Sequence, residues 1–446
     1  MHDVTEAVPR PRGRLSGELV GAGIAAALVL AAFTIPRIAS EHWRSKLYAG
    51  AAPLFGDWLT HVGWGSVPAI AVAILVIRFG PALAERLPWR RLLTLSWLTT
   101  VTWAFALAMI DGWQRGFAGR LTTTHEYLHE VPGVRDIPAM LRGFSGRILD
   151  FQPDSWTTHV SGHPPGALLF FVLLDRIGLG GGGWAGLACL LIGSSAIVAV
   201  AVTLRAFGVE DRARKALPFL TIAPAAVWIA VSADAVFAGV TAWAVALLAI
   251  AVGQPRRRWI AVASGVLFGL GIYLSYGLVI MAVPAVAVLI AGRTARPLLP
   301  ALLGALLVAA AFTMAGFWWL DGYHLVVERY YQGIATERPY AYWVWANLAA
   351  TVCAVGLATA AGIPRTLSHP REPGDPTALL VAAGLCAILV ADLSGLSKAE
   401  TERIWLPFDI WLMAATAFLP RSTVRVWLFV QALGTLVLAH TILTNW

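Results

Sequence analysis

Residues 165–178 read PGALLFFVLLDRIG, and this apolar run decides the topology that the sequence predicts. The run has 14 residues, whereas a helix needs about 20 to cross ~30 Å of hydrocarbon. Pro164 and Pro165 fix the direction in which the chain enters a helix and disfavour a helix before it. We therefore predict a helix at 165–178 that lies along the membrane surface or re-enters it.

The composition places the other apolar runs in a membrane. The chain of 446 residues is 58% hydrophobic and only 13% charged, which excludes a water-soluble core. The other apolar runs are 18–36, 65–79, 92–110, 184–203, 216–232, 234–252, 259–275, 277–292, 298–319, 341–362, 377–391, 404–420 and 424–443. Most are long enough to span, so we predict an all-α polytopic membrane protein with about 13 transmembrane helices plus the surface-lying helix.

Basic residues gather in the loops that this topology places on one face. They are Arg10, Arg12, Arg14, Arg78, Arg86, Arg90, Arg91, Arg205, Arg212, Arg214, Lys215, Arg256, Arg257, Arg258, Arg293, Arg296, Arg365, Arg371, Arg421 and Arg425. This basic face holds 20 of the 33 Lys and Arg but 8 of the 25 acids. By the positive-inside rule it is the cytoplasmic face of a multi-pass protein in the cytoplasmic membrane. The net charge of +8 therefore does not indicate nucleic acid as a partner.

The same pattern gives a domain organisation. We predict a cytoplasmic tail at 1–17, a transmembrane module at 18–362 with an outer loop at 111–164, and a C-terminal transmembrane bundle at 377–446. The stretch 363–376, IPRTLSHPREPGDP, is rich in proline and reads as a cytoplasmic linker between the two.

The outer loop has the residues for chemistry. Residues 111–166 contain six acids, five arginines and four histidines between two apolar helices. Two further polar regions, 320–340 and 392–409, fall on the same face. A loop this long and this ionisable on one face of a membrane protein indicates a functional site there.

Three short motifs in these regions resemble the GT-C superfamily of membrane glycosyltransferases, which includes protein O-mannosyltransferases and aminoarabinose lipid A transferases. They are His125-Glu126-Tyr127 in the loop, His163-Pro164-Pro165-Gly166 at the start of the short helix, and Glu402-Arg403-Ile404-Trp405-Leu406-Pro407 near the C-terminal side. The resemblance implies an inverting glycosyltransferase on the outer face. Its partners would be a polyprenyl-phosphate sugar donor, a glycan, lipid or protein acceptor, and membrane lipid.

The chain departs from the superfamily in two ways. Two extra spans, 18–36 and 65–79, precede the loop, and the usual pair of adjacent acids is replaced by Glu126 with Glu130. No cofactor is therefore assigned. A divalent metal is conceivable, but no ligand motif supports it, although His125 and His129 are spaced i, i+4.

Three acids are candidates for the catalytic base, which has to lie within hydrogen-bond reach of the acceptor hydroxyl. The resemblance favours Glu126; the alternative is a structural pair with Arg120 or Arg135. Glu130 lies one turn further on and would share a face with Glu126 in a helix, or it is a solvated loop acid. Asp111 is the third candidate, or it only caps the end of a helix.

The substrate-binding candidates are the groups suited to a lipid phosphate and a sugar. They are Tyr127, His163, Arg403, Lys398, Arg329, Tyr330 and Tyr331. For Arg403 the alternative is an internal salt bridge to Glu400 or Glu402, and for the tyrosines an interfacial aromatic belt. Asp234 reads as a helix cap.

Two other function classes remain open for the sequence. A lipid-linked substrate transporter or flippase usually has ionisable residues at mid-membrane and internal repeats, and neither pattern is found here. A non-catalytic membrane accessory subunit would be consistent with the missing acid pair.

Overall fold

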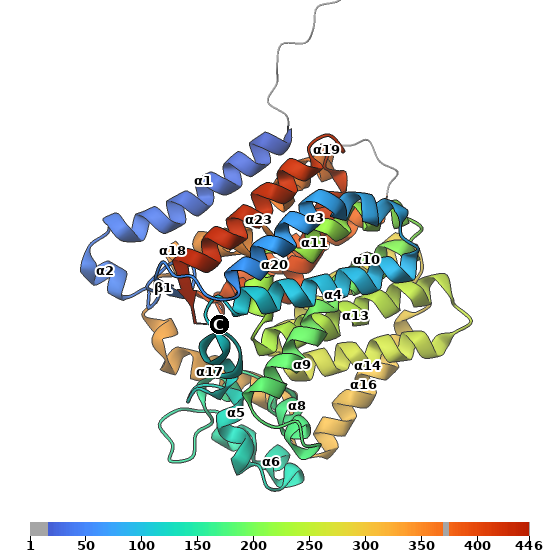
Figure 1. Cartoon of the computed structure of the whole chain (residues 1–446). Helices are drawn as coiled ribbons and strands as arrows, with labels where there is room; N and C mark the ends of the chain where they lie inside the picture. Colours follow the sequence, from blue (N-terminus) through green and yellow to red (C-terminus); the bar gives the residue numbers. More distant parts are fainter. Residues whose placement is uncertain (1–16, 369–373, 446) are drawn as a thin grey trace, which may run out of the picture.

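The computed structural model describes residues 17–368 and 374–445, and it is almost entirely helical (Figure 1). The N-terminal elements are α1 (Gly17–Ile38), α2 (Glu41–Ser45), β1 (Gly56–Trp58), α3 (Ser66–Arg86) and α4 (Trp89–Ala108). The outer loop forms the short helices α5 (Tyr127–Glu130), α6 (Ile137–Gly143) and α7 (Thr158–Ser161), and α8 (Pro165–Arg176) follows it.

The remaining elements complete the bundle. In the middle of the chain are α9 (Gly182–Ser194), α10 (Ala196–Ala206), α11 (Glu210–Thr221), α12 (Ala226–Ile229), α13 (Ala233–Gly253), α14 (Arg258–Leu274), α15 (Ala282–Ala291), α16 (Leu298–Met314) and α17 (Trp319–Gln332). The C-terminal part contains α18 (Tyr340–Val355), α19 (Leu357–Ser368), α20 (Pro376–Leu393), α21 (Thr401–Ile404), α22 (Leu406–Leu412), α23 (Val424–Thr441) and β2 (Ile442–Thr444).

The structure does not confirm 13 spans. Within 17–368 and 374–445, six helices are long and apolar enough to cross a membrane, or up to eight if each of two bent pairs is one span. The six are α1, α3, the continuous stretch Gly182–Ala206, α13, α20 and α23. Hydropathy detects apolar runs but not the breaks inside them. The run 216–232 is divided between α11 and α12, and α18 meets α19 at an angle of 102° at Gly356, whose φ is +83°.

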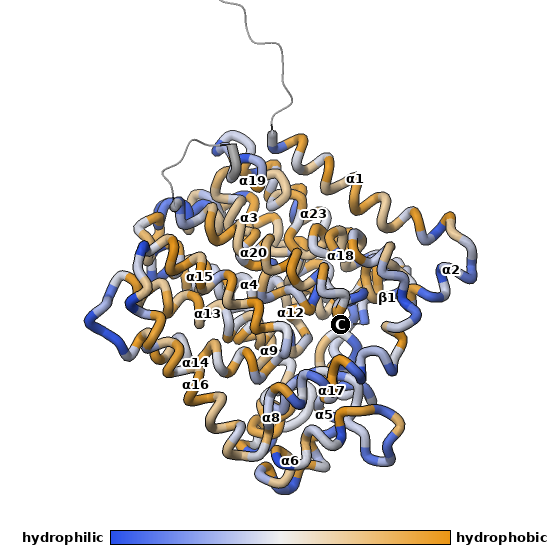
Figure 2. Tube along the Cα trace, turned by 180° about the vertical axis from the view of Figure 1, so that it is seen from behind, coloured by the Kyte–Doolittle hydropathy of each residue, from blue (hydrophilic) through white to orange (hydrophobic). Residues whose placement is uncertain are grey.

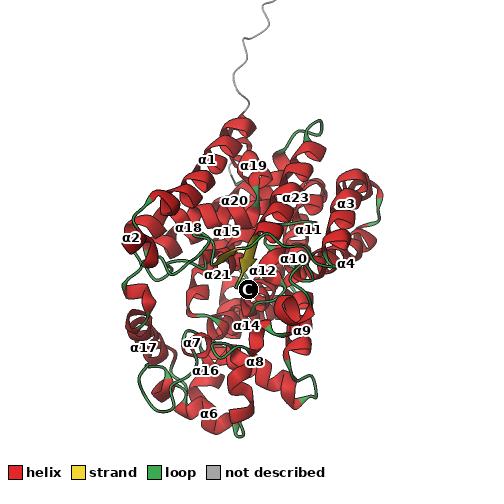
Figure 3. Cartoon of the chain, turned by 60° about the vertical axis from the view of Figure 1, so that its left-hand side comes forward, coloured by secondary structure: helices red, strands yellow, loops and turns green. Residues whose placement is uncertain are grey.

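Helix α8 matches the short run at 165–178. It has 12 residues, so it is about 18 Å long and too short to cross the hydrocarbon. Its position relative to the bilayer stays a prediction. The chain also contains a small antiparallel sheet of β1 and β2, with Gly56 opposite Thr444, which an all-α expectation does not include (Figure 3).

The loops on the predicted basic face contact one another. These contacts are Arg365 Nε to Glu18 Oε2 (3.0 Å), Arg212 Nη1 to Asp375 Oδ1 (2.6 Å) and Arg214 Nη1 to the carbonyl of Ala84 (2.7 Å). The three polar regions of the other face are joined by ion pairs of Arg329 with Asp150 and of Arg338 with Glu400. Helices α5, α6, α8 and α17 gather at the end of the molecule opposite α19 (Figures 1 and 2). The structure thus groups the loops as the charge pattern does. Which group is cytoplasmic remains a prediction.

One contiguous core of buried apolar residues runs from Ala22 to Ile442. Helix α20 packs against α15 and α22, so the predicted front module and C-terminal bundle share this core. The division at 363–376 stays a prediction, and residues 369–373 of that linker, like residues 1–16 of the predicted tail, lie outside the described residues.

Candidate functional site

The centre of the candidate site is the side chain of Arg403 on α21. It is 5% exposed, and its two terminal nitrogens contact two acids: Nη1 lies 2.5 Å from Asp234 Oδ2, and Nη2 lies 2.7 Å from Glu400 Oε2. Burial opposes the positive charge, but the carboxylates of Asp234, Glu400 and Glu126 outweigh it and raise the pKa of Arg403. The guanidinium is therefore a fixed cation inside the protein.

Glu400 connects this cation to a second one. Its Oε1 lies 3.5 Å from Nη1 of Arg338, which also donates to the carbonyl of Lys398 at 2.7 Å. Burial alone would raise the pKa of Glu400, but the guanidinium groups of Arg403 and Arg338 lower it. Glu400 adopts a left-handed backbone with φ of +64°, which is unfavourable for a residue with a side chain. The two arginine contacts compensate for that strain.

Glu126 approaches the same cluster from the outer loop. It precedes the first residue of α5, but its side chain does not cap the helix. The carboxylate is 3% exposed, and its Oε1 lies 3.4 Å from Nε2 of His159 on α7. The backbone of His159 is held in turn, since its N–H donates to the carbonyl of His125 at 3.0 Å. The loop therefore presents Glu126 inward, toward Arg403, rather than to solvent.

Tyr127 and His163 form a buried pair beside Glu126. The Tyr127 hydroxyl lies 2.9 Å from His163 Nδ1, which also lies 2.8 Å from the carbonyl of His159. Burial lowers the pKa of His163 to about 4 and raises that of Tyr127, so both stay neutral at ordinary pH. Because a carbonyl only accepts, the single hydrogen belongs on Nδ1. His163 Nδ1 thus contacts both the Tyr127 hydroxyl and the carbonyl of His159, and the role of His163 toward a phosphate stays a prediction.

Asp111 heads a neighbouring group of charges. Its Oδ1 lies 2.7 Å from His61 Nε2, and its Oδ2 accepts from Arg120 Nη2 at 2.8 Å. Arg120 also donates to the carbonyl of Thr444 at 2.7 Å. Burial lowers the pKa of Arg120 to about 10, although Asp111 and Glu126 oppose the shift. Asp111 therefore does more than end α4, and Arg120 links its group to Glu126.

Two sequence candidates take part in other contacts. Glu130 accepts from the backbone N–H of Thr157 at 3.0 Å and lies 3.6 Å from Arg147, so it holds the outer loop in shape. Because α5 begins only at Tyr127, the shared helical face predicted for Glu126 and Glu130 does not form. Arg329 lies 2.6 Å from Asp150 and lowers the pKa of that carboxyl.

Three further candidates lie on the Arg338 side of the cluster. The Lys398 ammonium donates to the carbonyl of Ala335 at 2.9 Å. Burial raises the pKa of Tyr330 to about 12, and the positive charge of Arg338 acts in the opposite direction. Tyr331 is half exposed, and its ring lies edge-on to that of Tyr330. Their contacts thus involve Ala335, Arg338 and one another rather than Glu126.

The sequence interpretation missed two members of the cluster. The sequence predicts that Asp234 caps a helix, and it does lie in the first turn of α13. Its carboxylate, however, accepts a hydrogen bond from Arg403. The sequence names Glu400 only as a partner of Arg403 in an internal salt bridge, the alternative to phosphate binding. The structure confirms that salt bridge. The available signal was the position of Asp234, an isolated acid between two apolar runs.

The carboxylates of the cluster are arranged around cations. Within the ranges 17–368 and 374–445, no three His, Cys, Asp or Glu side chains are placed to hold a metal ion. His125 Nδ1, from the pair spaced i, i+4, lies 3.4 Å from the Thr158 hydroxyl.

The buried carboxyl group of Glu402 makes the folding stability depend on pH, which can be measured. It is 1% exposed, and its Oε1 accepts from the backbone N–H of Phe55 at 2.8 Å. Burial raises its pKa to about 7, so the folded state holds the proton more tightly than the unfolded chain. The proton on Glu402 therefore contributes roughly 3 kcal/mol to the free energy of unfolding. This contribution is fully present below about pH 4.5 and is lost as the pH rises through 7.

We expect Glu402→Gln, which is neutral at every pH, to remove that loss. The measurement is the unfolding temperature of both proteins in detergent between pH 5 and pH 8.5. The wild type should lose stability relative to the variant as the pH rises. Parallel curves for the two proteins would show that Glu402 does not hold a proton in the folded state.

No protein-family model and no curated protein matches the chain. Among solved structures, the chain is similar to the crystal structure of the Archaeoglobus fulgidus oligosaccharyltransferase in complex with Zn and sulfate. The TM-score is 0.43 at 16% sequence identity, and the match covers 78% of this chain and 52% of the other. The chain thus spans about half the length of that protein. The side chains described above, rather than this similarity, support the function proposed below.

Proposed function

We propose that the protein is a glycosyltransferase that moves a sugar from a polyprenyl-phosphate carrier to an acceptor hydroxyl at the outer face of the cytoplasmic membrane. The supporting observation is the convergence of Glu126 with Arg403 and Arg338. These residues lie far apart in the sequence, in regions that the charge pattern places on one face. In the structure Arg403 and Arg338 both contact Glu400, and Asp234 contacts Arg403. Glu126, paired with His159, is buried close enough for its charge to raise the pKa of Arg403.

Glu126 is the proposed general base. Its carboxylate takes the proton of the acceptor hydroxyl as the hydroxyl oxygen attacks the anomeric carbon. The bond from that carbon to the phosphate oxygen breaks, and the lipid phosphate leaves with the electron pair. One displacement inverts the configuration at the anomeric carbon. His159, 3.4 Å from the carboxylate, orients the base.

Arg403 and Arg338 are the proposed ligands of the leaving phosphate. A guanidinium fork binds phosphate oxygens in bidentate fashion and stabilises the charge that develops on them. Both arginines are held by Glu400, so their orientation is fixed before substrate binds. Lys398 and Tyr330 lie on the Arg338 side, where they would meet the same phosphate or the sugar.

The burial of Glu126 sets a condition on this function. With the carboxylate 3% exposed, an acceptor reaches it only when the part of the outer loop that carries α5 and α7 moves away from α21. Loop movement that completes or uncovers a site is common in transferases.

A non-catalytic accessory subunit is the second candidate. It is favoured by the pairing of Arg403 with two carboxylates, because a charge network compensated in this way also serves structure alone. The two functions differ in one measurable property: a glycosyltransferase turns over a sugar donor, and an accessory subunit does not.

The deciding experiment is label transfer. The purified full chain in vesicles is incubated with polyprenyl-phosphate mannose, arabinose or glucose, each labelled in the sugar, together with membrane acceptors. A glycosyltransferase moves label to an acceptor and releases polyprenyl phosphate from at least one donor. Absence of both products with every donor would favour the accessory subunit.

A further inference from the structure

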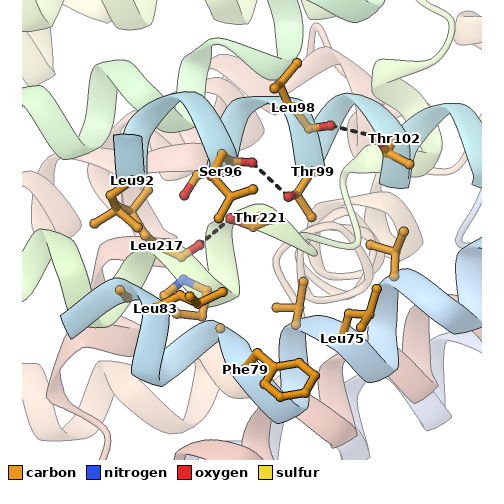
Figure 4. Close-up of a pocket in the computed structure, with 16 residues that line it drawn as sticks. Leu75, Phe79, Leu83, Leu92, Ser96, Leu98, Thr99, Thr102, Leu217 and Thr221 are labelled. Atoms are coloured by element: carbon orange, nitrogen blue, oxygen red, sulfur yellow. Dashed lines mark hydrogen bonds between the residues drawn. The ribbon is translucent and has the colours of Figure 1, made fainter. Parts of the chain in front are cut away.

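A groove lies between α3, α4 and α11, at the other end of α4 from Asp111. It encloses about 490 Å³ and is lined mainly by apolar side chains, among them Leu75, Phe79 and Leu83 of α3 and Leu95 and Leu98 of α4 (Figure 4). These five side chains are between 39% and 56% exposed, so the protein itself leaves them uncovered. A patch of this kind on a membrane protein is a surface for apolar chains.

The three threonine hydroxyls in the groove are hydrogen-bonded within their own helices. Thr99 donates to the carbonyl of Leu95, Thr102 to that of Leu98, and Thr221 to that of Leu217, each at 2.8 Å. Each hydroxyl is thus used within its own helix, and Figure 4 shows these side chains facing the gap between α3 and α4. The groove therefore suits a hydrocarbon chain rather than a polar ligand.

Two arginines extend the groove at the α3–α4 connection. On α3, Leu75, Phe79, Leu83 and Arg86 follow at spacings of four, four and three residues, which places them on one helix face. On α4, Arg91, Leu95, Leu98 and Thr102 follow at four, three and four, again on one face. Each apolar stripe that lines the groove therefore ends in an arginine.

Neither arginine has an anionic partner among the residues that the structure describes. Both are exposed, and among the residues described, no hydrogen bond or ion pair of either side chain is found. The nearby acid Glu85 pairs with Arg421 instead, at 3.3 Å. Arg90, next in sequence to Arg91, lies on a different face of α4, in line with Thr94.

We propose that this groove binds one anionic phospholipid, with an acyl chain between α3 and α4 and the phosphate between Arg86 and Arg91. The stripe from Leu75 to Arg86 is about 16 Å long at ~1.5 Å per residue, which matches one leaflet of ~15 Å. The charge of the two guanidinium groups selects a lipid with net negative charge over a zwitterionic one. The site lies on the predicted cytoplasmic face and does not depend on the proposed sugar transfer.

Native mass spectrometry of the full chain in detergent tests the site. The wild type is titrated with phosphatidylglycerol and with phosphatidylcholine of the same chains, and tighter binding of one phosphatidylglycerol is expected. Each basic residue near an anionic headgroup contributes about a factor of five. Arg86→Gln with Arg91→Gln should therefore weaken phosphatidylglycerol binding roughly 25-fold.

Arg90→Gln is the matched control, since it removes the same charge from the same turn of α4 but from another face. Its affinity should stay within about twofold of the wild type. Leu75→Trp, which fills the groove and keeps both arginines, should weaken binding of both lipids. Equal losses for Arg90→Gln and Arg91→Gln, equal binding of the two lipids, or unchanged binding in Leu75→Trp would each overturn the site. Equal competition by glycerol 3-phosphate would do so as well, because it carries the phosphate without a chain.

Discussion

Glu126→Gln is expected to lower the rate of sugar transfer by a factor of about 10² to 10⁴, the usual contribution of a positioned general base. Glutamine has nearly the same shape as glutamate, and its side-chain oxygen still faces His159, so the loop keeps its fold. The amide has no basic oxygen for the acceptor proton. Donor binding should persist, because Arg403 and Arg338 are unchanged.

The measurement is a single-turnover assay with labelled donor, alongside donor binding at equilibrium. Glu130→Gln is the comparison, because it removes a carboxylate from the short helix α5, which directly follows Glu126. Glu130 contacts Thr157 and Arg147, which are both residues of the outer loop. The rate of sugar transfer in Glu130→Gln should therefore fall by no more than about tenfold. If Glu130→Gln lost as much as Glu126→Gln, the role of base would pass to Glu130. If neither variant lost activity, the loop would not supply the base.

Asp234→Asn is expected to destabilise the protein by about 3–5 kcal/mol, because it leaves the buried guanidinium of Arg403 with one carboxylate fewer. The unfolding temperature in detergent should fall by several degrees. The control is Arg421→Gln, which breaks an ion pair with Glu85 in which both side chains are more than half exposed. An exposed pair of this kind contributes about 0–1 kcal/mol, so the control should unfold close to the wild type.

A double-mutant cycle separates the ion pair from other effects of Asp234. Adding Arg403→Gln to Asp234→Asn removes the cation that the single variant leaves without this carboxylate. Part of the stability lost in Asp234→Asn should therefore return in the double variant. Strictly additive losses would mean that the two side chains do not depend on each other. The catalytic network would then lack its central contact.

Some contacts between loops agree with the grouping predicted from charge. Arginines in separate loops, such as Arg212 and Arg365, bind acids of other loops in the same predicted group. The positive-inside pattern therefore carried real spatial information. The number of spans did not follow from the sequence, because hydropathy averages over breaks such as the one between α11 and α12. The pairing of β1 with β2 joins residues 56–58 to residues 442–444, and no local sequence pattern predicts a pairing between segments so far apart.

The candidate site stays a prediction, but part of its geometry followed from the sequence. Tyr127 and His163, from the two motifs nearest in sequence, contact each other, and the charge of Glu126 acts on Arg403 of the third. Asp234 was missed because one acid at a helix start looks the same whether it caps the helix or binds an arginine from a distant segment. The left-handed backbone at Glu400, which aims its carboxylate at two arginines, also has no sequence signature.

Photo-crosslinking of the donor tests the central proposal most directly. A polyprenyl phosphate with a diazirine next to the phosphate is irradiated with the purified full chain, and the labelled peptides are identified by mass spectrometry. We predict label in the peptides that contain Tyr330, Lys398 or Arg403, and its loss when unmodified polyprenyl-phosphate sugar competes. Label confined to the α3–α4 groove, or spread over the lipid-facing helices without competition, would contradict the proposed site.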